Sequence, residues 1–253
     1  MNRTLLFGEG LFETIRWTGE SRKVRLHYQR LSRSAAFFEI PCPPYEEFLK
    51  ALKTASGGKI NVCLRFSLLS SGSDHFAEAP SGYEIRVDLR DVPSLPRKVE
   101  LTVSSLRRHS GNPLFRHKTV NYMFSVLVRR EAHRKGFYDA IVLNEREELT
   151  ECSASNLLLL IGGKLYTPSP ESGLLWGTTL DILTREMSVR VDRLDRSHLE
   201  KAESLFITNS LIGVVPVHRI NGRQLKVDSD LLGEMRTILS RWEAPLEGKG
   251  GKI

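Results

Sequence analysis

The sequence predicts an α+β protein built in two parts. Polar and apolar residues alternate, as they do in strands, at 11–16, 59–69, 83–90 and 98–105. Apolar residues recur at helical spacing at 27–40, 44–56, 119–135, 178–188 and 228–242. A polar segment broken by Gly111 and Pro113 separates the elements before residue 106 from those after residue 117. We therefore expect a small N-terminal domain at 1–106, a linker at 107–116 and a larger C-terminal domain at 117–253.

The N-terminal part opens with a strand whose alternation places Phe12, Thr14 and Arg16 on one face. We expect a second strand at Lys23–Leu26 to pair with it across the short TGES segment. The next two helices are expected to end at Pro41 and at a pair of glycines. The strands that follow are joined by a long polar segment without helix or strand pattern.

The C-terminal part alternates helices with short apolar strands. Its first helix, at 119–135, is expected to end at Gly136. Strands are predicted at 139–144, 156–161, 204–207 and 214–220. Ser197 with Glu200 predicts a capping box at the start of a short helix, and an amphipathic helix at 228–242 follows the last strand.

The composition is that of a soluble globular protein of 253 residues, with 40% hydrophobic and 26% charged residues. No apolar run approaches the ~20 residues of a membrane span, and the N-terminus does not resemble a signal peptide. We expect a cytoplasmic protein without a membrane partner. The cysteines (Cys42, Cys63 and Cys152) are widely spaced, so neither a disulfide framework nor a metal site is expected.

The net charge of +7 permits a nucleic-acid partner, but other features oppose it. Basic residues are scattered among acidic ones, and aromatic and basic residues do not interleave. No nucleic-acid partner is therefore expected, and a basic nucleic-acid-binding protein without catalysis is kept only as a remote alternative. Anionic small substrates explain the charge equally well.

Lys118 and Glu151 are the first candidates for chemistry, because each stands at the edge of a regular element. A lysine can form a Schiff base with an aldehyde cofactor and then carry a proton. A carboxylate beside a pyridine nitrogen keeps that nitrogen protonated, which makes the ring an electron sink. The neighbours Ser153, Ser155 and Asn156 could orient Glu151 by hydrogen bonds. Taken singly, the two candidates also fit a solvated lysine and a loop glutamate.

Gly177, Thr178 and Thr179 open a helix and offer a seat for a phosphate. The free N–H groups and the dipole of a helix N-terminus attract anions. The TNS segment at 208–210 offers further hydroxyls at a strand end, and Arg30 could supply a cation. An ordinary threonine N-cap and a surface arginine are the alternative explanations.

Together and in this order, the motifs resemble those of the class IV pyridoxal-phosphate enzymes. These comprise branched-chain aminotransferases, D-amino-acid aminotransferases and aminodeoxychorismate lyase. The resemblance runs nearly the whole length: FGEGLFETIR resembles the opening motif, HYQRLSRSA the arginine-bearing helix, HKTVNY the lysine motif, LTECSASN the glutamate motif, GLLWGTT the phosphate loop and TNSLIGVVPV the last block. The lysine and glutamate blocks are the most specific.

The resemblance implies fold type IV, with a small α/β domain and a larger domain around a β-barrel-like core, in a homodimer that binds pyridoxal 5'-phosphate (PLP). Lys118 would form the Schiff base and act as general acid and base, while Glu151 would hold the pyridine nitrogen. The implied cofactor-binding set is Lys118, Glu151, Arg30, Tyr122, Asn156, Gly177, Thr178, Thr179 and Ser210. Among the departures from the pattern, Leu180 stands where an arginine often follows the phosphate loop, and LLSSGSDHF replaces a glycine- and arginine-rich loop.

Within the family, the motifs favour the lyase of folate biosynthesis, which converts 4-amino-4-deoxychorismate into p-aminobenzoate and pyruvate. The asparagine–serine–leucine form of the last block and the TECSASN block resemble lyases, and KTVN resembles lyases and D-amino-acid enzymes alike. Tyr122 fits the branched-chain enzymes, so an aminotransferase of branched-chain or D-amino acids stays the alternative. Arg65, Arg16 and Asn209 are the substrate-binding candidates.

Overall fold

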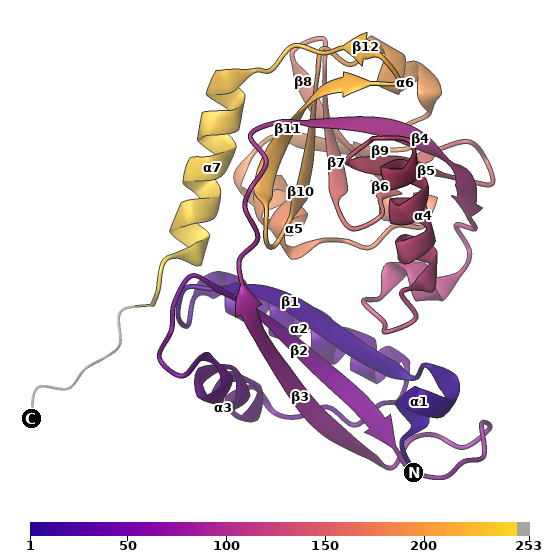
Figure 1. Cartoon of the computed structure of the whole chain (residues 1–253), viewed down its shortest axis with the longest axis vertical. Helices are drawn as coiled ribbons and strands as arrows, with labels where there is room; N and C mark the ends of the chain where they lie inside the picture. The colour runs from indigo at the N-terminus through magenta and orange to yellow at the C-terminus, as the bar shows by residue number, and fades with distance from the viewer. Residues whose placement is uncertain (247–253) are drawn as a thin grey trace, which may run out of the picture. The chain divides into compact units, whose positions relative to one another are not determined.

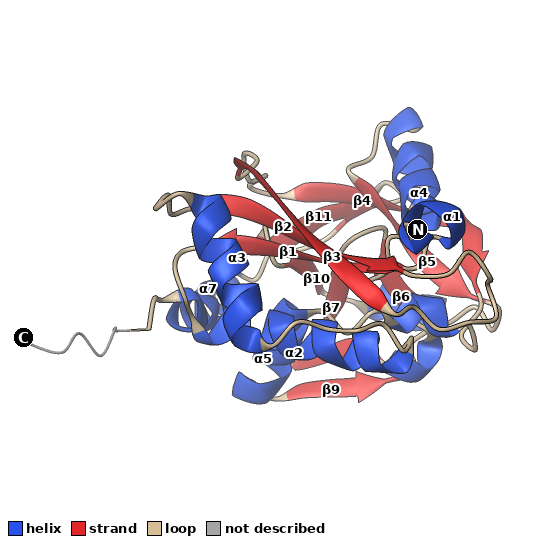
Figure 2. Cartoon of the chain, turned by 90° about the horizontal axis from the view of Figure 1, so that it is seen from below, coloured by secondary structure: helices blue, strands red, loops and turns tan. Residues whose placement is uncertain are grey.

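The computed structural model describes residues 1–246 and packs as two compact units. Unit 1 comprises Met1–Pro93, Lys118–Val120 and the stretch from Ser240 onward, and unit 2 comprises Ser94–His117 and Asn121–Leu239. Both contain helices and strands, so the predicted α+β class is confirmed (Figure 1 and Figure 2). None of the helices in this described part of the chain is long and apolar enough to cross a membrane.

Unit 1 is an antiparallel sheet covered by helices. The sheet has the order β1-β2-β3, with β1 (Gly10–Trp17), β2 (Val62–Ser71) and β3 (Gly82–Asp91). The helices α2 (Arg22–Phe37) and α3 (Tyr45–Ser56) pack on it, and the short α1 (Arg3–Phe7) precedes β1. The core between helices and sheet includes Phe48 and Phe66, whose ring centroids lie 4.7 Å apart. Full burial of such a side chain contributes about 2–3 kcal/mol.

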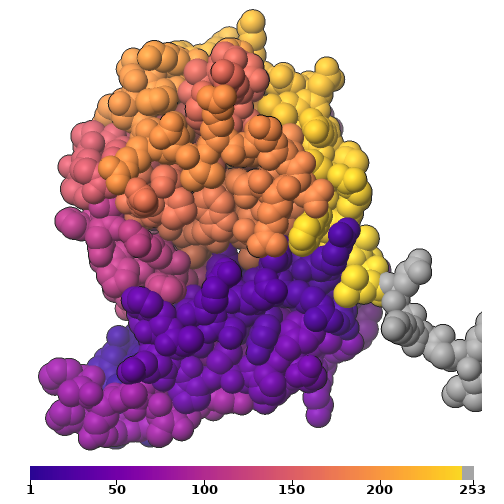
Figure 3. Space-filling view, turned by 180° about the vertical axis from the view of Figure 1, so that it is seen from behind, coloured from indigo at the N-terminus to yellow at the C-terminus, as the bar shows by residue number. Residues whose placement is uncertain are grey.

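The loop between β2 and β3 projects from unit 1, at lower left in the space-filling view (Figure 3). A buried arginine organises it: Arg3 donates to the carbonyl oxygens of Ser73 (2.6 Å), His75 (3.0 Å) and Glu78 (2.8 Å) and to the Glu9 carboxylate (2.6 Å). This is the loop whose sequence departs from the family pattern. One buried guanidinium thus binds three carbonyl oxygens of this loop.

The strand predicted at Lys23–Leu26 is wrong, because these residues form the first turn of α2. The run Lys-Val-Arg-Leu alternates like a strand, but Lys23, Val24 and Leu26 are all buried, as on one side of a helix that starts after Ser21. The short α1 also escaped prediction. Its N-cap Asn2 accepts a hydrogen bond from the Leu5 amide, and Gly8 ends it with φ of 68°.

Unit 2 is built around a curled mixed sheet with the order β6-β5-β4-β11-β10-β7-β8-β9, and β12 pairs with β11. The strands are β4 (Val99–Arg108), β5 (Asp139–Asn144), β6 (Leu149–Cys152), β7 (Asn156–Ile161), β8 (Lys164–Pro168), β9 (Val189–Asp192), β10 (Ser204–Asn209), β11 (Gly213–Ile220) and β12 (Arg223–Gln224). The two ends of the sheet approach each other, since the Leu149 amide donates to the Leu194 carbonyl at 2.6 Å. This near closure gives the barrel-like core that the family resemblance implies.

The helices of unit 2 cover both faces of this sheet. They are α4 (Met123–Arg134), α5 (Thr178–Glu186), α6 (Arg196–Lys201) and most of α7 (Ser229–Glu243), with 3-10 turns at Pro113–Arg116 and Pro170–Ser172. Strand β5 is buried on both sides: Ile141 and Leu143 face the large core, while Ala140 and Val142 pack under α4. The predicted capping box is displaced. Asp195 is the N-cap of α6 and pairs reciprocally with His198.

The boundaries of the two compact units differ from the domain boundaries expected from the sequence. Strand β4 pairs with β5 and β11, so it belongs to unit 2 although 98–106 fell in the expected N-terminal domain. Lys118–Val120 belongs to unit 1, and so do the described residues from Ser240 on. Packing partners distant in sequence, rather than local composition, set these boundaries.

Candidate active site

Lys118 lies on the open edge of β1, in unit 1. Its carbonyl accepts from the Phe12 amide at 2.9 Å, and the Val120 amide donates to the Gly10 carbonyl at 3.0 Å. These bonds extend the β1 edge by a short strand-like segment, which fixes the backbone of the lysine. The Lys118 Nζ atom lies 4.4 Å from the centroid of the Phe12 ring.

Both arginines proposed for a substrate carboxylate share the Phe12 face of the sheet. Arg65 is the register partner of Thr14, and its guanidinium carbon lies 3.7 Å from the Phe12 ring centroid. Arg16 follows on the same face by alternation. Since the core residues Leu11 and Ile15 occupy the other face, Lys118, Arg65 and Arg16 stand on the side away from the helices.

Arg30 lies on the opposite, helix-covered side of the sheet, in a buried ionic cluster. Its Nε and Nη2 donate to the two carboxylate oxygens of Glu13 at 2.8 and 2.6 Å, and the His27 Nδ1 lies 2.6 Å from Glu13 Oε2. Burial alone would raise the pKa of Glu13, but the charge of Arg30 and the contact with His27 lower that pKa to about 2. Burial lowers the pKa of His27, against the opposing effect of the Glu13 carboxylate.

Glu151 lies in unit 2 at the end of β6, and its carboxylate is held from three directions. Oε1 accepts from Arg108 Nη1 at 2.6 Å and from the Leu175 amide at 3.1 Å, while Oε2 accepts from Asn156 Nδ2 at 3.3 Å. Only 8% of Glu151 is exposed. Of the polar neighbours proposed to orient it, Asn156 does so. Ser153 instead donates to Asp139 and Ser155 contacts Asn209.

Arg108 is the residue that the sequence did not single out. It ends β4, is 3% exposed, and lies 4.7 and 5.5 Å from the ring centroids of Phe115 and Phe124. A buried charge needs a partner, and Glu151 is that partner. The only local signal was a basic residue at the end of an alternating strand, inside a segment expected to be a linker.

The N-terminus of α5 has the features of a phosphate seat. Its N-cap Gly177 supplies no side chain, and Thr178 Oγ1 lies 3.0 Å from Ser210 Oγ. The Thr179 hydroxyl is buried and has no hydrogen-bond partner among the described residues. An uncapped helix N-terminus with a buried, unpaired hydroxyl favours an anion as the missing partner.

Asn156 joins this seat to Glu151. Its Nδ2 donates to Glu151 and to the Leu175 carbonyl (2.8 Å), and its Oδ1 accepts from the Gly177 amide at 3.2 Å. One side chain therefore connects the acid with the first residue of the seat.

Tyr122 and Asn209 line a pocket of about 280 Å³ within unit 2, together with Ser125, Arg129, Arg130, Tyr138 and the 153–155 loop. The Asn209 amide is used for structure: Nδ2 donates to Ala154 O (3.1 Å) and Ser155 Oγ (3.0 Å), and Oδ1 accepts from the amides of Leu211 and Ile212. Asn209 thus ties the loop after Glu151 to the turn after β10.

The sequence and the fold are similar to those of known proteins of one family. The model of the amino-transferase class IV family matches residues 10–220. A protein of Thermotoga maritima named "Probable branched-chain-amino-acid aminotransferase" is 34% identical over 77% of this chain and 71% of its own. The aminodeoxychorismate lyase of Vibrio harveyi is 29% identical over 90% of this chain and 89% of its own. A crystal structure from Legionella pneumophila, provisionally named 4-amino-4-deoxychorismate lyase, superimposes with a TM-score of 0.86 at 27% identity, over 94% of this chain and 92% of that one.

Proposed function

The chain belongs to the amino-transferase class IV family, and on that premise we propose that it is a lyase that converts 4-amino-4-deoxychorismate into p-aminobenzoate and pyruvate. Family membership makes PLP its cofactor. We propose Lys118 as the residue that holds it covalently, Glu151 as the acid at its ring nitrogen, and Thr178, Thr179 and Ser210 as its phosphate ligands. Tyr122 is proposed for the phenolic oxygen. Arg30 pairs with Glu13 on the side of the unit 1 sheet opposite Lys118, so we leave it out of the proposed phosphate ligands.

Each residue has a defined task in this proposal. Bound PLP supplies an electron sink for the negative charge that develops on the carbon bearing the substrate amine. Glu151, fixed by Arg108 and Asn156, holds a proton on the ring nitrogen. Lys118 takes the proton from the amine-bearing carbon, as a positioned general base. Arg65 and Arg16 offer cations on the Lys118 side of the unit 1 sheet for a substrate carboxylate.

The contact between Asn209 and Ser155, 3.0 Å from Nδ2 to Oγ, is the observation that most supports the lyase over an aminotransferase. These residues come from the two sequence blocks that resemble lyases, TNSLIGVVPV and LTECSASN. A glycine-threonine-alanine form of the last block, typical of the branched-chain enzymes, has no amide at this position to make that bond. The two lyase-like blocks therefore depend on each other in this fold.

An aminotransferase of branched-chain or D-amino acids is the second candidate. The Thermotoga relative supports it, as does the placement of Tyr122, which fits the branched-chain motif and lines the pocket beside the 153–155 loop. Both reactions share the removal of a proton by Lys118. They differ in the product: an aminotransferase yields a keto acid, whereas the lyase expels pyruvate.

The deciding experiment supplies 4-amino-4-deoxychorismate alone, without any keto acid. We expect p-aminobenzoate, followed by its fluorescence, and an equal amount of pyruvate, followed by reduction with lactate dehydrogenase. The same preparation is then given leucine or D-alanine with a keto acid acceptor. Transamination of either amino acid without p-aminobenzoate formation would overturn the lyase. The Asn209→Gly variant should lose lyase activity more than any transaminase activity.

A further inference from the structure

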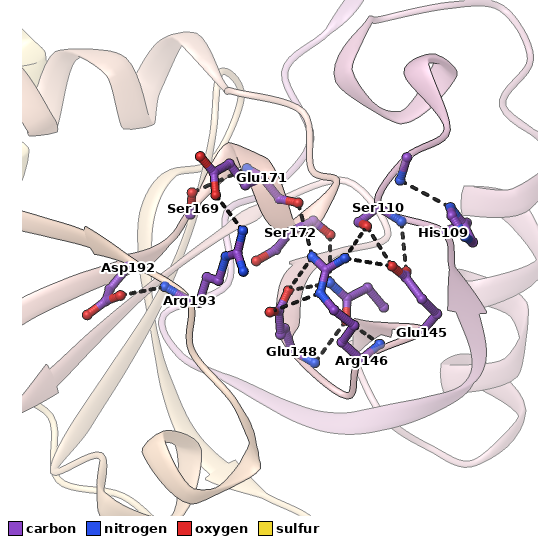
Figure 4. Close-up of polar contacts among 12 residues, drawn as sticks. His109, Ser110, Glu145, Arg146, Glu148, Ser169, Glu171, Ser172, Asp192 and Arg193 are labelled. Atoms are coloured by element: carbon purple, nitrogen blue, oxygen red, sulfur yellow. Dashed lines mark hydrogen bonds and ion pairs between the residues drawn. The ribbon is translucent and has the colours of Figure 1, made fainter.

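A second polar cluster surrounds Arg146, in the turn between β5 and β6 (Figure 4). The Arg146 guanidinium donates to three separate segments. Its Nη1 contacts Ser110 Oγ (2.7 Å) and Glu145 Oε1 (2.8 Å), and its Nη2 contacts Glu148 Oε2 (2.8 Å) and the Glu171 carbonyl (3.3 Å). A fork of this geometry suits arginine and cannot be reproduced by lysine.

The cluster fastens two segments to one turn. On one side, Glu145 accepts from both the amide and the hydroxyl of Ser110, at 2.8 and 2.6 Å. On the other, Asn144 Nδ2 donates to the Ser172 carbonyl at 3.1 Å, beside the bond from Arg146 to Glu171. Arg146 is the cation that lies between the carboxylates of Glu145 and Glu148. Its removal leaves those two charges close together and uncompensated.

These two segments adjoin the groups that hold Glu151. Ser110 packs so closely on Gly173 that a Cβ added to Gly173 would lie 2.6 Å from the Ser110 Cα atom. The Gly173 carbonyl accepts from Arg108 Nη1 at 3.2 Å, and the same nitrogen donates to Glu151. Arg108 precedes Ser110 by two residues, and Gly173 follows Ser172 directly.

We propose that Arg146 is a positioning residue for the Glu151 carboxylate. Arg146 holds Ser110 next to the 171–172 segment. This fixes Arg108 and the backbone from Gly173 to Leu175, and these groups together orient Glu151 Oε1. The inference rests on the proposed role of Glu151 at the cofactor ring nitrogen and is independent of the choice between lyase and aminotransferase.

The first test compares the PLP affinity of Arg146→Gln with that of Arg193→Gln. Arg193 pairs with the Glu171 side chain at 2.7 Å in the same region, but the pair is largely exposed and does not touch Ser110. Titration of each apoprotein with PLP, followed by tryptophan fluorescence, should show about tenfold weaker binding for Arg146→Gln, because groups that orient a ligand-binding side chain typically contribute at least that much. Arg193→Gln should stay within about twofold of wild type. Equal affinities for wild type and Arg146→Gln would overturn the proposal.

A double-mutant cycle with Glu151→Gln separates positioning from general stability. If Arg146 acts through Glu151, its removal in the Glu151→Gln background should change PLP affinity by less than about twofold. A full tenfold effect in that background would mean that Arg146 acts elsewhere, and would overturn the proposal. A wild-type protein that does not bind PLP would overturn the proposed function as well, so the two failures are distinguishable.

Discussion

Gly177 and Asn156 are so close that a Cβ on Gly177 would lie 2.2 Å from the Asn156 Oδ1 atom. The same oxygen accepts the Gly177 amide, and the same side chain donates to Glu151. The space beside Gly177 is thus filled by the residue that connects the acid to the phosphate seat. A side chain at this position would act on both.

Gly177→Ala should therefore weaken PLP binding through a displaced Asn156. We expect at least about tenfold lower affinity and a loss of about 1–3 kcal/mol in the free energy of unfolding, as for other overpacked sites. PLP titration of the apoprotein and urea denaturation measure the two effects. Gly233→Ala is the control, because no described residue lies within 4 Å of a Cβ at that helical glycine and a gain of stability is expected there. Undiminished affinity in Gly177→Ala would argue against the link.

Lys118→Ala should abolish covalent attachment of the cofactor. Borohydride reduction of the holoenzyme, followed by peptide mass spectrometry, should place the cofactor on the peptide that contains Lys118. Activity should fall at least about 100-fold, because a positioned general base contributes that much or more. The exposed Lys164 is the control, and Lys164→Ala should keep both labelling and activity. Labelling of any other lysine in the wild type would refute the assignment.

Arg65→Gln should raise KM for the substrate more than it lowers kcat. A charged hydrogen bond to a carboxylate contributes about 1.5–3 kcal/mol, which corresponds to roughly 10- to 100-fold in KM. Arg65 is preferred to Arg16 because its guanidinium lies on the same aromatic ring as Lys118. Steady-state kinetics of Arg65→Gln, Arg16→Gln and, as control, the exposed Arg86→Gln distinguish them. If only Arg16→Gln raises KM, the roles of the two arginines are exchanged.

Glu13 should make unit 1 sensitive to acid. Its pKa is about 2 in the folded chain and 4.5 for an unperturbed glutamate, so the unfolded state binds the proton first as the pH falls. The stability from Glu13 is complete above about pH 5 and is lost between about pH 5 and 2, on the order of 3 kcal/mol in total. Urea denaturation at pH 7, 5 and 3 should show this loss in the wild type.

The Glu13→Gln variant should differ in two ways. It should be less stable at pH 7 by about 3–5 kcal/mol, because Arg30 loses its buried counter-charge. It should also lose less stability than the wild type between pH 5 and 3. The exposed Glu84→Gln is the control and should follow the wild type at each pH. A parallel loss in Glu13→Gln and wild type would exclude Glu13 as the acid-sensitive group.

The spacing of apolar residues in the sequence predicted the helices and strands that have one regularly buried face. Strands β2, β3, β5, β7 and β11, and helices α3 and α5, lie within a few residues of their predicted ranges, because alternation and helical spacing mark a buried face directly. The short strands β6 and β9 were not predicted, because four residues are too few for alternation to mark a buried face. The Lys23–Leu26 strand failed because four alternating residues also fit one helical turn.

The candidate site shows the same division. Three candidates stand out in the sequence, because charged or hydroxyl residues lie there at the ends of predicted helices and strands: Lys118, Glu151 and the Gly177–Thr179 segment. Arg108 does not stand out, because its role depends on an ion pair with Glu151, which lies far away in the sequence. Likewise, the pairing of Arg30 with Glu13 comes from a helix and a strand that sequence spacing alone does not place face to face.

The near closure of the unit 2 sheet bears on how the protein avoids aggregation. Because Leu149 is bonded to Leu194, the edge strand β6 exposes less unpaired backbone to a strand of another molecule. In unit 1 the Lys118 segment occupies one side of β1, which leaves β3 at the other edge of the sheet in the described structure. That strand carries Glu84, Arg86, Asp88 and Arg90 in alternation, so a self-associating neighbour would meet closely spaced charges. The segment that carries Lys118 therefore also covers the backbone edge of β1.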